Sequence, residues 1–86
     1  MTISYTTKFK KQYKKLPSKF QQQFDDRLKL FVVDQTHPKL RVHPLKGSFA
    51  GYWSMNVNGD LRAIYLVQGD EVIIFALIVT HSELYG

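Results

Sequence analysis

Three segments rich in β-branched and aromatic residues fill most of the second half of the chain, and two short glycine turns separate them. The segments are residues 52–57, 61–67 and 72–79, with Asn58-Gly59 and Gly69-Asp70 between them. Runs of this composition, bounded by turn residues, are typical of strands joined by tight connections. This half of the chain is therefore predicted to form three strands of an antiparallel sheet.

The length of the first turn decides which side chains share a face, because neighbours along a strand point to opposite sides. A two-residue loop at Asn58-Gly59 would place Asp60 and Arg62 on the apolar face, whereas a three-residue loop over 58–60 keeps that face free of charge. We favour the longer loop, since a charge in the core is costly. The predicted apolar face carries Trp53, Met55, Val57, Leu61, Ala63, Tyr65 and Val67, and the mixed face carries Tyr52, Ser54, Asn56, Arg62, Ile64 and Leu66.

The last strand is apolar on both faces, which predicts an interior position in the sheet. When the same alternation is extended across Gly69-Asp70, His81 falls just past the strand end on the face of Arg62. The alternation also places on that face Ile73, Phe75, Leu77 and Val79.

The first half of the chain predicts a short strand and two helices. Ile3 and Tyr5 alternate with polar neighbours, as in a strand. A first helix then follows, with Phe9, Tyr13 and Leu16 at helical spacing among Lys8, Lys10, Lys11, Lys14 and Lys15, and Pro17 ends it.

A second helix is predicted to start at a capping box formed by Ser18 and Gln21 and to end at Thr36-His37-Pro38. One stripe of it carries Phe20, Phe24, Leu28 and Phe31. The whole chain, residues 1–86, then forms a single α+β domain: a short N-terminal strand and a two-helix hairpin packed on one face of an antiparallel sheet, which three C-terminal strands complete.

Composition narrows the class of protein. The chain has no cysteine, which excludes disulfides and thiolate metal sites. Residues 1–13 do not form the apolar run of a signal peptide, and the most apolar stretch, 72–79, is too short to span a bilayer. We therefore expect a soluble cytoplasmic protein without membrane contact.

Charge is divided unevenly along the chain. The net charge is +5, and residues 1–46 hold eleven of the twelve lysines and arginines but only three acids. A basic half indicates a polyanion partner, or an acidic protein that covers it. A solvated lysine-rich helix face remains an equal alternative.

A few polar residues suit the cleavage of RNA, which needs a base, an acid and positive charge near the phosphate. Histidine fits acid–base work, and the planar fork of arginine fits a phosphate. His43 and His81 stand at loop and strand-end positions, whereas His37 precedes Pro38 and is expected to be structural. The histidine spacing matches no zinc motif, and no cofactor motif is present, so neither a metal nor a cofactor is predicted.

Two further residues, Arg62 and Tyr85, have two interpretations each. Arg62 either serves a site or forms an ion pair with Asp60 or Glu83. Tyr85 either stacks on a base or donates to a phosphate, or it anchors the C-terminal tail. Trp53, with Tyr65, is expected to pack in the core.

Three segments resemble the RelE/ParE superfamily, nearest its YafQ-like branch of ribosome-dependent mRNA interferases. They are the motif His43-Pro44-Leu45-Lys46-Gly47, the stretch from Gly51-Tyr52 to Asp60-Leu61-Arg62-Ala63-Ile64-Tyr65, and the end Thr80-His81-Ser82-Glu83-Leu84-Tyr85-Gly86. The predicted order of strand, two helices and three strands is similar to that family over the whole chain. The resemblance implies the toxin of a type II toxin–antitoxin system, a metal-independent endoribonuclease that cuts mRNA on the ribosome and so inhibits translation.

The resemblance also implies roles for individual residues. His43 and His81 correspond to the general base and general acid of YafQ-like enzymes, with Asp60 as an acidic member of that site and Tyr85 as its C-terminal aromatic. Arg62 corresponds to the phosphate-binding arginine of RelE-like members. The sequence departs from the pattern in two ways: Asn56 replaces a further site histidine, and the paired RelE lysines fall near Trp53 and Met55. RNA and ribosome contacts are expected from Lys10, Lys11, Lys14, Lys15, Lys46 and Asn56.

The implied partners are a small acidic antitoxin, mRNA and the ribosome, with operator DNA reached only through the antitoxin complex. Two other functions stay open. A ParE-like toxin would share the fold but inhibit DNA gyrase, although such an inhibitor has no need of His43 and His81. A non-cleaving member would only bind its antitoxin or RNA, which Asn56 keeps possible.

Overall fold

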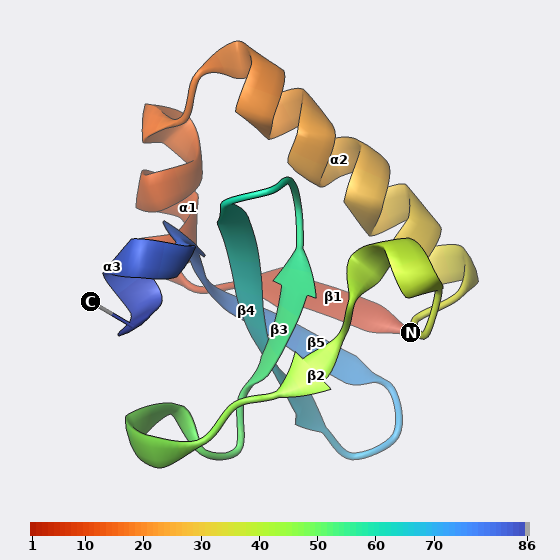
Figure 1. Cartoon of the computed structure of the whole chain (residues 1–86). Coiled ribbons are helices and arrows are strands. Elements are labelled where there is room, and N and C mark those ends of the chain that lie inside the picture. The colour runs from red at the N-terminus through yellow and green to blue at the C-terminus, as the bar shows by residue number, and fades with distance from the viewer. Residues whose placement is uncertain (86) are drawn as a thin grey trace.

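The computed structural model describes residues 1–85 and confirms an α+β fold with two long helices beside one sheet (Figure 1). Its strands are β1 (Thr2–Tyr5), β2 (His43–Pro44), β3 (Trp53–Asn56), β4 (Leu61–Gln68) and β5 (Val72–Thr80). Its α-helices are α1 (Thr7–Lys15), α2 (Ser18–Val33) and α3 (His81–Tyr85), and two 3₁₀ turns are η1 (Pro38–Leu40) and η2 (Gly47–Phe49).

The sheet is mixed, with the strand order β1-β5-β4-β3-β2. The three strands of the second half pair antiparallel as predicted, but β1 runs parallel to β5. The apolar strand β5 lies inside the sheet between β1 and β4, which confirms its predicted interior position. The two-residue edge strand β2 was not predicted, and it pairs antiparallel with β3.

The β3–β4 connection is the predicted three-residue loop. Met55 pairs with Ala63 and Asn56 pairs with Arg62, so the charged Asp60 stays in the turn. The Asn58 side chain closes this turn, because its Oδ1 accepts hydrogen bonds from the backbone N–H groups of residues 60 and 61 at 2.9 and 2.7 Å. An asparagine that bonds the backbone ahead of it in this way is a common turn device.

The alternation along β5 fails at a β-bulge. Ile64 of β4 pairs with Leu77, but the next residue, Tyr65, pairs with Phe75, so Ala76 is an extra residue on β5. Leu77 keeps its predicted place on the Arg62 face. The prediction for Ile73 and Phe75 is wrong, because the extra residue turns them to the helix-covered face, where both are buried.

The start of α1 is hydrogen-bonded to this bulge. The Thr6 hydroxyl donates to the carbonyl of Ala76 at 2.9 Å, and the Thr6 N–H donates to the carbonyl of Phe75 at 3.0 Å. Nearby, the backbone N–H of Ile78 donates to Oε1 of Gln12 at 2.9 Å. The irregular stretch of β5 therefore has hydrogen-bond partners from α1 and its N-cap.

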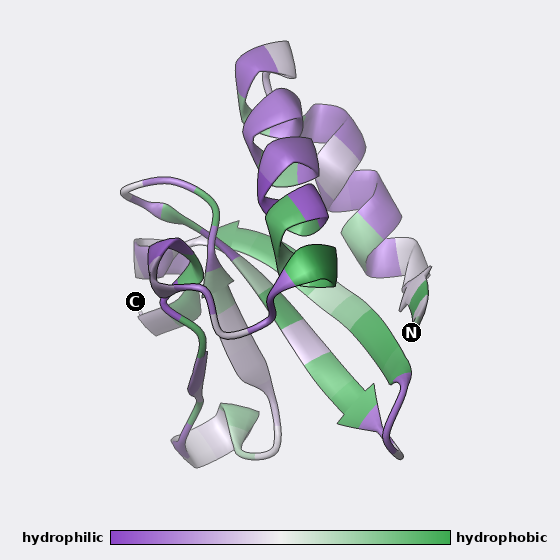
Figure 2. Cartoon of the chain, turned by 90° about the vertical axis from the view of Figure 1, so that its right-hand side faces the viewer, coloured by the Kyte–Doolittle hydropathy of each residue, from purple (hydrophilic) through white to green (hydrophobic). Residues whose placement is uncertain are grey.

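The sheet is buried on both faces. The larger core joins Phe9 of α1 and two phenylalanines of α2 to the face of Met55 and Phe75. Figure 2 shows apolar green along much of the sheet and polar purple over most of the long helices. The smaller core on the opposite face consists of Leu45, Ile64, Val79 and Leu84, with Phe49, Tyr52 and Leu77 packed against it.

Two expectations about side chains need correction. Tyr65 is packed as predicted, and burial raises the pKa of its hydroxyl to about 12. Trp53, in contrast, is 36% exposed on β3, next to the two-residue edge strand β2, and Val67 is 44% exposed next to the end of β4.

The predicted capping box of α2 is also wrong. Pro17 is the N-cap and offers no side-chain hydrogen bond, so Ser18 already lies inside the first turn. The Gln21 side chain instead donates to the carbonyl of Tyr13 at 2.9 Å, near the end of α1. Within residues 1–85, no helix is long and apolar enough to cross a membrane.

The bulge predicts different costs for two neighbouring core residues. Phe75→Ala should lower the free energy of unfolding by roughly 3–5 kcal/mol, because it opens a cavity among the rings of the helix-side core. Leu77→Ala should cost less, since Leu77 is only partly buried on the other face. Urea denaturation measures both, and a larger loss for Leu77→Ala would contradict this register.

Candidate active site

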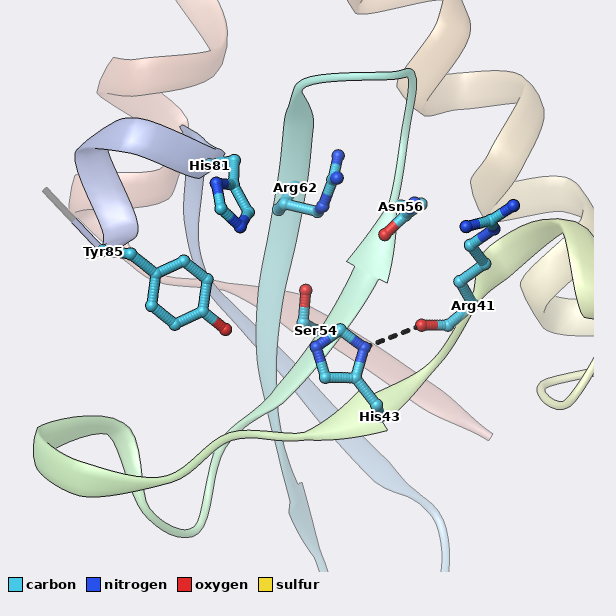
Figure 3. A pocket seen from close by; sticks show the side chains of 7 residues that line it. All are labelled: Arg41, His43, Ser54, Asn56, Arg62, His81 and Tyr85. Atoms are coloured by element: carbon cyan, nitrogen blue, oxygen red, sulfur yellow. Dashed lines mark hydrogen bonds between the residues drawn. The ribbon is translucent and has the colours of Figure 1, made fainter.

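Seven residues line a hollow on the face of the sheet opposite α1 and α2 (Figure 3). Its volume is about 300 Å³. Edge strand β2 and the helix α3 flank it, and side chains of β3 and β4 form its floor. The lining residues are Arg41, His43, Ser54, Asn56, Arg62, His81 and Tyr85.

Five of the predicted site residues meet in this hollow. They come from four elements: β2 carries His43, β3 carries Asn56, β4 carries Arg62, and α3 carries His81 and Tyr85. Strand pairing explains why these side chains lie close together, since Asn56 pairs directly with Arg62. In the same way, His43 pairs with Ser54, so their side chains share one face of the sheet.

The backbone before β2 orients the His43 ring. Nδ1 of His43 lies 2.9 Å from the carbonyl oxygen of Arg41. Because a carbonyl can only accept, Nδ1 carries the hydrogen, and in the neutral ring Nε2 is then the free lone pair. Arg41 has a φ of 45°, a left-handed conformation that is uncommon outside glycine and is often found at functional sites.

A capping box starts α3 and sets the place of His81. The Glu83 carboxylate accepts from the backbone N–H of Thr80 at 2.9 Å, and the Thr80 hydroxyl accepts from the N–H of Glu83 at 3.1 Å. The N–H of Thr80 and its hydroxyl together hold the pKa of Glu83 below its ordinary value. The sequence Thr80-His81-Ser82-Glu83 contains this signature, which sequence analysis overlooked.

Asp60 reaches α3 from the β3–β4 loop. The backbone N–H of His81 donates to the carbonyl of Asp60 at 2.8 Å and contacts its Oδ1 at 3.3 Å. Asp60 does not line the hollow. Its contacts instead join the hairpin loop to the first residue of α3.

Tyr85 lies beside His81, one helical turn further on. The two ring centroids are 4.7 Å apart with the planes inclined at 50°, and the tyrosine is 60% exposed. Such exposure contradicts the alternative that Tyr85 is a buried anchor for the tail. Leu84 has that role, since it is buried in the smaller core.

Arg62 forms hydrogen bonds with backbone carbonyls. Its guanidinium donates from Nη1 to the carbonyls of Asn58 and Leu61 at 2.9 and 3.2 Å, and from Nη2 to that of Gly59 at 3.3 Å. These bonds replace the ion pair considered for Arg62, and the carboxylates of Asp60 and Glu83 bind backbone N–H groups instead. A guanidinium has five N–H donors, so three such bonds leave two for a ligand.

Two lining residues were missed as site residues. Arg41 has no sequence signal, because nothing in its neighbours predicts a left-handed backbone. Ser54 lies on the predicted face of the sheet, but it was not predicted as a site residue. It is only 1% exposed, and its hydroxyl has no hydrogen-bond partner among residues 1–85.

Several predicted contact residues lie away from the hollow. The lysines of α1 belong to the helix that packs on the opposite face of the sheet, and two of them, Lys10 and Lys14, border an apolar groove between α1 and α2. Lys46 is exposed but does not line the hollow. His37 caps η1, because its Nδ1 accepts a hydrogen bond from the N–H of Lys39 at 3.1 Å. This is the structural role that was expected for His37. Residues 1–85 contain no group of three or more His, Cys, Asp or Glu side chains that could hold a metal ion.

Several solved structures of toxins have a similar fold. The YoeB/ParE toxin from Agrobacterium tumefaciens matches with a TM-score of 0.78 and 21% identity, covering 94% of this chain and 99% of that one. YafQ from E. coli strain BL21(DE3) matches with a TM-score of 0.77 and 26% identity, covering 98% and 97%. The E. coli DinJ–YafQ toxin–antitoxin complex contains a chain that matches at 0.74 and 27%, covering 98% and 96%.

The family is identified over the full length. The model of the family described as the bacterial toxin of type II toxin–antitoxin system, YafQ, matches residues 1–86. The chain therefore belongs to the YafQ family of type II toxins. No curated protein sequence matches it.

The buried hydroxyl of Ser54 predicts a stabilising substitution. A buried polar group without a partner loses its hydrogen bonds to water and gains none in the protein. Ser54→Ala should therefore raise the free energy of unfolding by about 1 kcal/mol. Ser48→Ala, at an exposed serine of η2, should leave it nearly unchanged. Urea denaturation of the two variants is the measurement, and destabilisation by Ser54→Ala would show that the hydroxyl has a partner.

Proposed function

We propose that this toxin is an endoribonuclease that cleaves mRNA on the ribosome and so inhibits translation. The observation that carries the proposal is the meeting of two imidazoles and one guanidinium, from His43, His81 and Arg62, in a single hollow. These groups supply a base, an acid and a phosphate-binding cation, which is the full set that metal-independent RNA cleavage needs. Membership of the YafQ family supports the same activity.

In the proposed mechanism His43 is the general base. Its Nδ1 is bound to the Arg41 carbonyl, so the free Nε2 takes the proton of the RNA 2′-hydroxyl. The 2′-oxygen then forms a bond to phosphorus, and the bond from phosphorus to the 5′-oxygen breaks. His81 is the general acid that protonates this leaving oxygen, so the products are a 2′,3′-cyclic phosphate and a 5′-hydroxyl end.

The other site residues bind the RNA or hold the catalytic groups in position. Arg62 binds the phosphate through its remaining N–H donors while the hairpin carbonyls hold its side chain. Tyr85, exposed beside His81, stacks on a base or donates to the phosphate. Asp60 acts as a positioning residue, because it contacts the backbone of His81 and does not line the hollow. Asn56 contributes hydrogen bonds to RNA but no proton transfer.

A cognate acidic antitoxin is the proposed protein partner. The E. coli DinJ–YafQ complex shows a YafQ toxin bound to its antitoxin. The basic half of this chain, with the exposed residues Lys11 and Lys15 on α1, fits an acidic protein or ribosomal RNA. We propose cytoplasmic action, with operator DNA contacted only through the antitoxin complex.

Expression of the toxin without an antitoxin tests the function directly. Growth should stop, and new mRNA 5′ ends should appear within translated regions. A DNA gyrase supercoiling assay on the same protein is the control. Unchanged mRNA together with inhibited supercoiling would replace this proposal with a ParE-like function.

Substitutions of the acid and of the cation should each reduce cleavage while the fold persists. His81→Ala should lower the rate roughly 10²–10⁴-fold through loss of the general acid. Arg62→Ala should lower it on the order of 10²–10³-fold, by analogy with lost oxyanion donors. Arg62→Lys should recover only part of that loss, because a point charge lacks the fork of arginine. Single-turnover cleavage rates are the measurement.

His37→Ala is the matched control, since this histidine lies outside the hollow, and it should retain full activity. His43→Ala should remove the limb of the pH–rate profile on which activity rises as the base loses its proton. Thermal unfolding of every variant separates a lost catalytic group from a lost fold. Full cleavage and toxicity in both His81→Ala and Arg62→Ala would disprove the site assignment.

A further inference from the structure

A second hollow adjoins the candidate active site on the side of α2. Its volume is about 340 Å³, and its lining includes two asparagines and further residues of the β3–β4 loop. Four cationic side chains line it, and no acidic residue does. We call it the basic groove, and its cations are Arg27, Lys39, Arg41 and Arg62.

The basic groove is continuous with the candidate active site. Arg41, Asn56 and Arg62 line both hollows. Figure 3 shows Arg41 and Asn56 on the side of the site that faces α2, opposite His81 and Tyr85. A chain-like ligand with one group beside Arg62 therefore has a path into the groove.

The cations of the groove come from elements that other contacts hold in place. Lys39 and Arg41 flank Leu40, which is fully buried in the helix-side core. Arg27 lies one turn beyond Gln23 on α2, and Oε1 of Gln23 accepts from Nδ2 of Asn58 at 3.0 Å. This bond joins α2 to the β3–β4 loop, so the two walls of the groove are connected directly.

Four cations around one hollow repel one another unless an anion lies between them. Two or more guanidinium groups suit a phosphate, because each can donate paired hydrogen bonds to its oxygens. An acidic protein segment would also neutralise the positive charge of the groove. The residues that the groove shares with the candidate active site favour the RNA strand instead. A solvated surface would leave the concentration of cations beside the active site unexplained.

We propose that the basic groove binds the phosphate next to the scissile one on the same RNA strand. This inference rests on the proposed function and adds a subsite to it. Arg27 and Lys39 contact only the flanking phosphate, while Arg41 and Arg62 lie between the two phosphates. The groove thereby fixes the direction in which the strand crosses the active site and contributes to binding rather than to the chemical step.

The test measures binding to a short RNA that carries a 2′-O-methyl group at the scissile nucleotide, so that it cannot be cut. Each phosphate is replaced in turn by a neutral methylphosphonate, and fluorescence anisotropy gives the affinity for every oligonucleotide. With the unaltered toxin, neutralising one flanking phosphate should weaken binding severalfold. In Arg27→Gln/Lys39→Gln the same replacement should have a much smaller effect, because the two cations that contact only this phosphate are gone and only the shared Arg41 and Arg62 remain.

Salt dependence gives a second readout. The slope of log affinity against log salt should become shallower by about 0.7 for each phosphate contact that Arg27→Gln/Lys39→Gln removes from single-stranded RNA. The control is Lys19→Gln/Lys29→Gln, which changes the net charge equally on exposed lysines of α2 that do not line the groove. That control should keep both the slope and the methylphosphonate effect.

Two outcomes would overturn the subsite. One is a methylphosphonate effect that is equal in the groove variant and the unaltered toxin at every position. The other is the same affinity and salt slope in the groove and control variants, which would leave the groove as a solvated surface or a site for an acidic protein segment. Neither outcome depends on cleavage, so a toxin that binds RNA through the groove without cutting it would contradict only the proposed catalysis.

Discussion

The extra residue at Ala76 in β5 determines how the rest of the molecule is arranged. The strand is apolar along its whole length, and a regular strand would present Ile73, Phe75, Leu77 and Val79 on one face. The bulge divides them, so that Phe75 meets the helices and Leu77 and Val79 pack on the opposite face. One strand thus supplies two cores, and α1 begins at the bulge through the hydrogen bonds of Thr6.

The candidate active site depends on the same strand. Val79 pairs with Arg62, and β5 then ends at Thr80, where the capping box with Glu83 turns the chain into α3. That turn carries His81 to the hollow, and Asp60 holds its backbone from the β3–β4 loop. The histidine is exposed, but its backbone N–H is bound by Asp60 and the capping box between Thr80 and Glu83 surrounds it, so its position is fixed before any ligand binds.

Local patterns predicted most of this site, and the failures have physical causes. The three-residue loop was predicted because a shorter loop would put the charges of Asp60 and Arg62 on the core face. This loop placed Asn56 and Arg62 correctly. Alternation cannot reveal a bulge in a strand that is apolar on both faces, because either register buries only apolar groups. A similar ambiguity affected the helix starts: Ser18 and Gln21 have the spacing of a capping box, but Pro17 already occupies the N-cap. The left-handed Arg41 lacks any local signal, so its carbonyl bond to His43 required the structure.

The positive charge of the chain has two parts that differ in their surroundings. The lysines of α1 lie on the helix side of the sheet, away from the candidate active site, and Lys10 and Lys14 there border an apolar groove with Asp25. The cations of the basic groove include Arg41 and Arg62, which also line the candidate active site with His43, and no acid lines the groove. The two groups of cations contribute in the same way to the net charge. Their contribution to nucleic-acid binding differs, because counterion release depends on the phosphates that each group contacts. Under the proposed function, the position of the groove beside the candidate active site favours the RNA strand as its ligand, and the α1 face is then free to bind an antitoxin or ribosomal RNA.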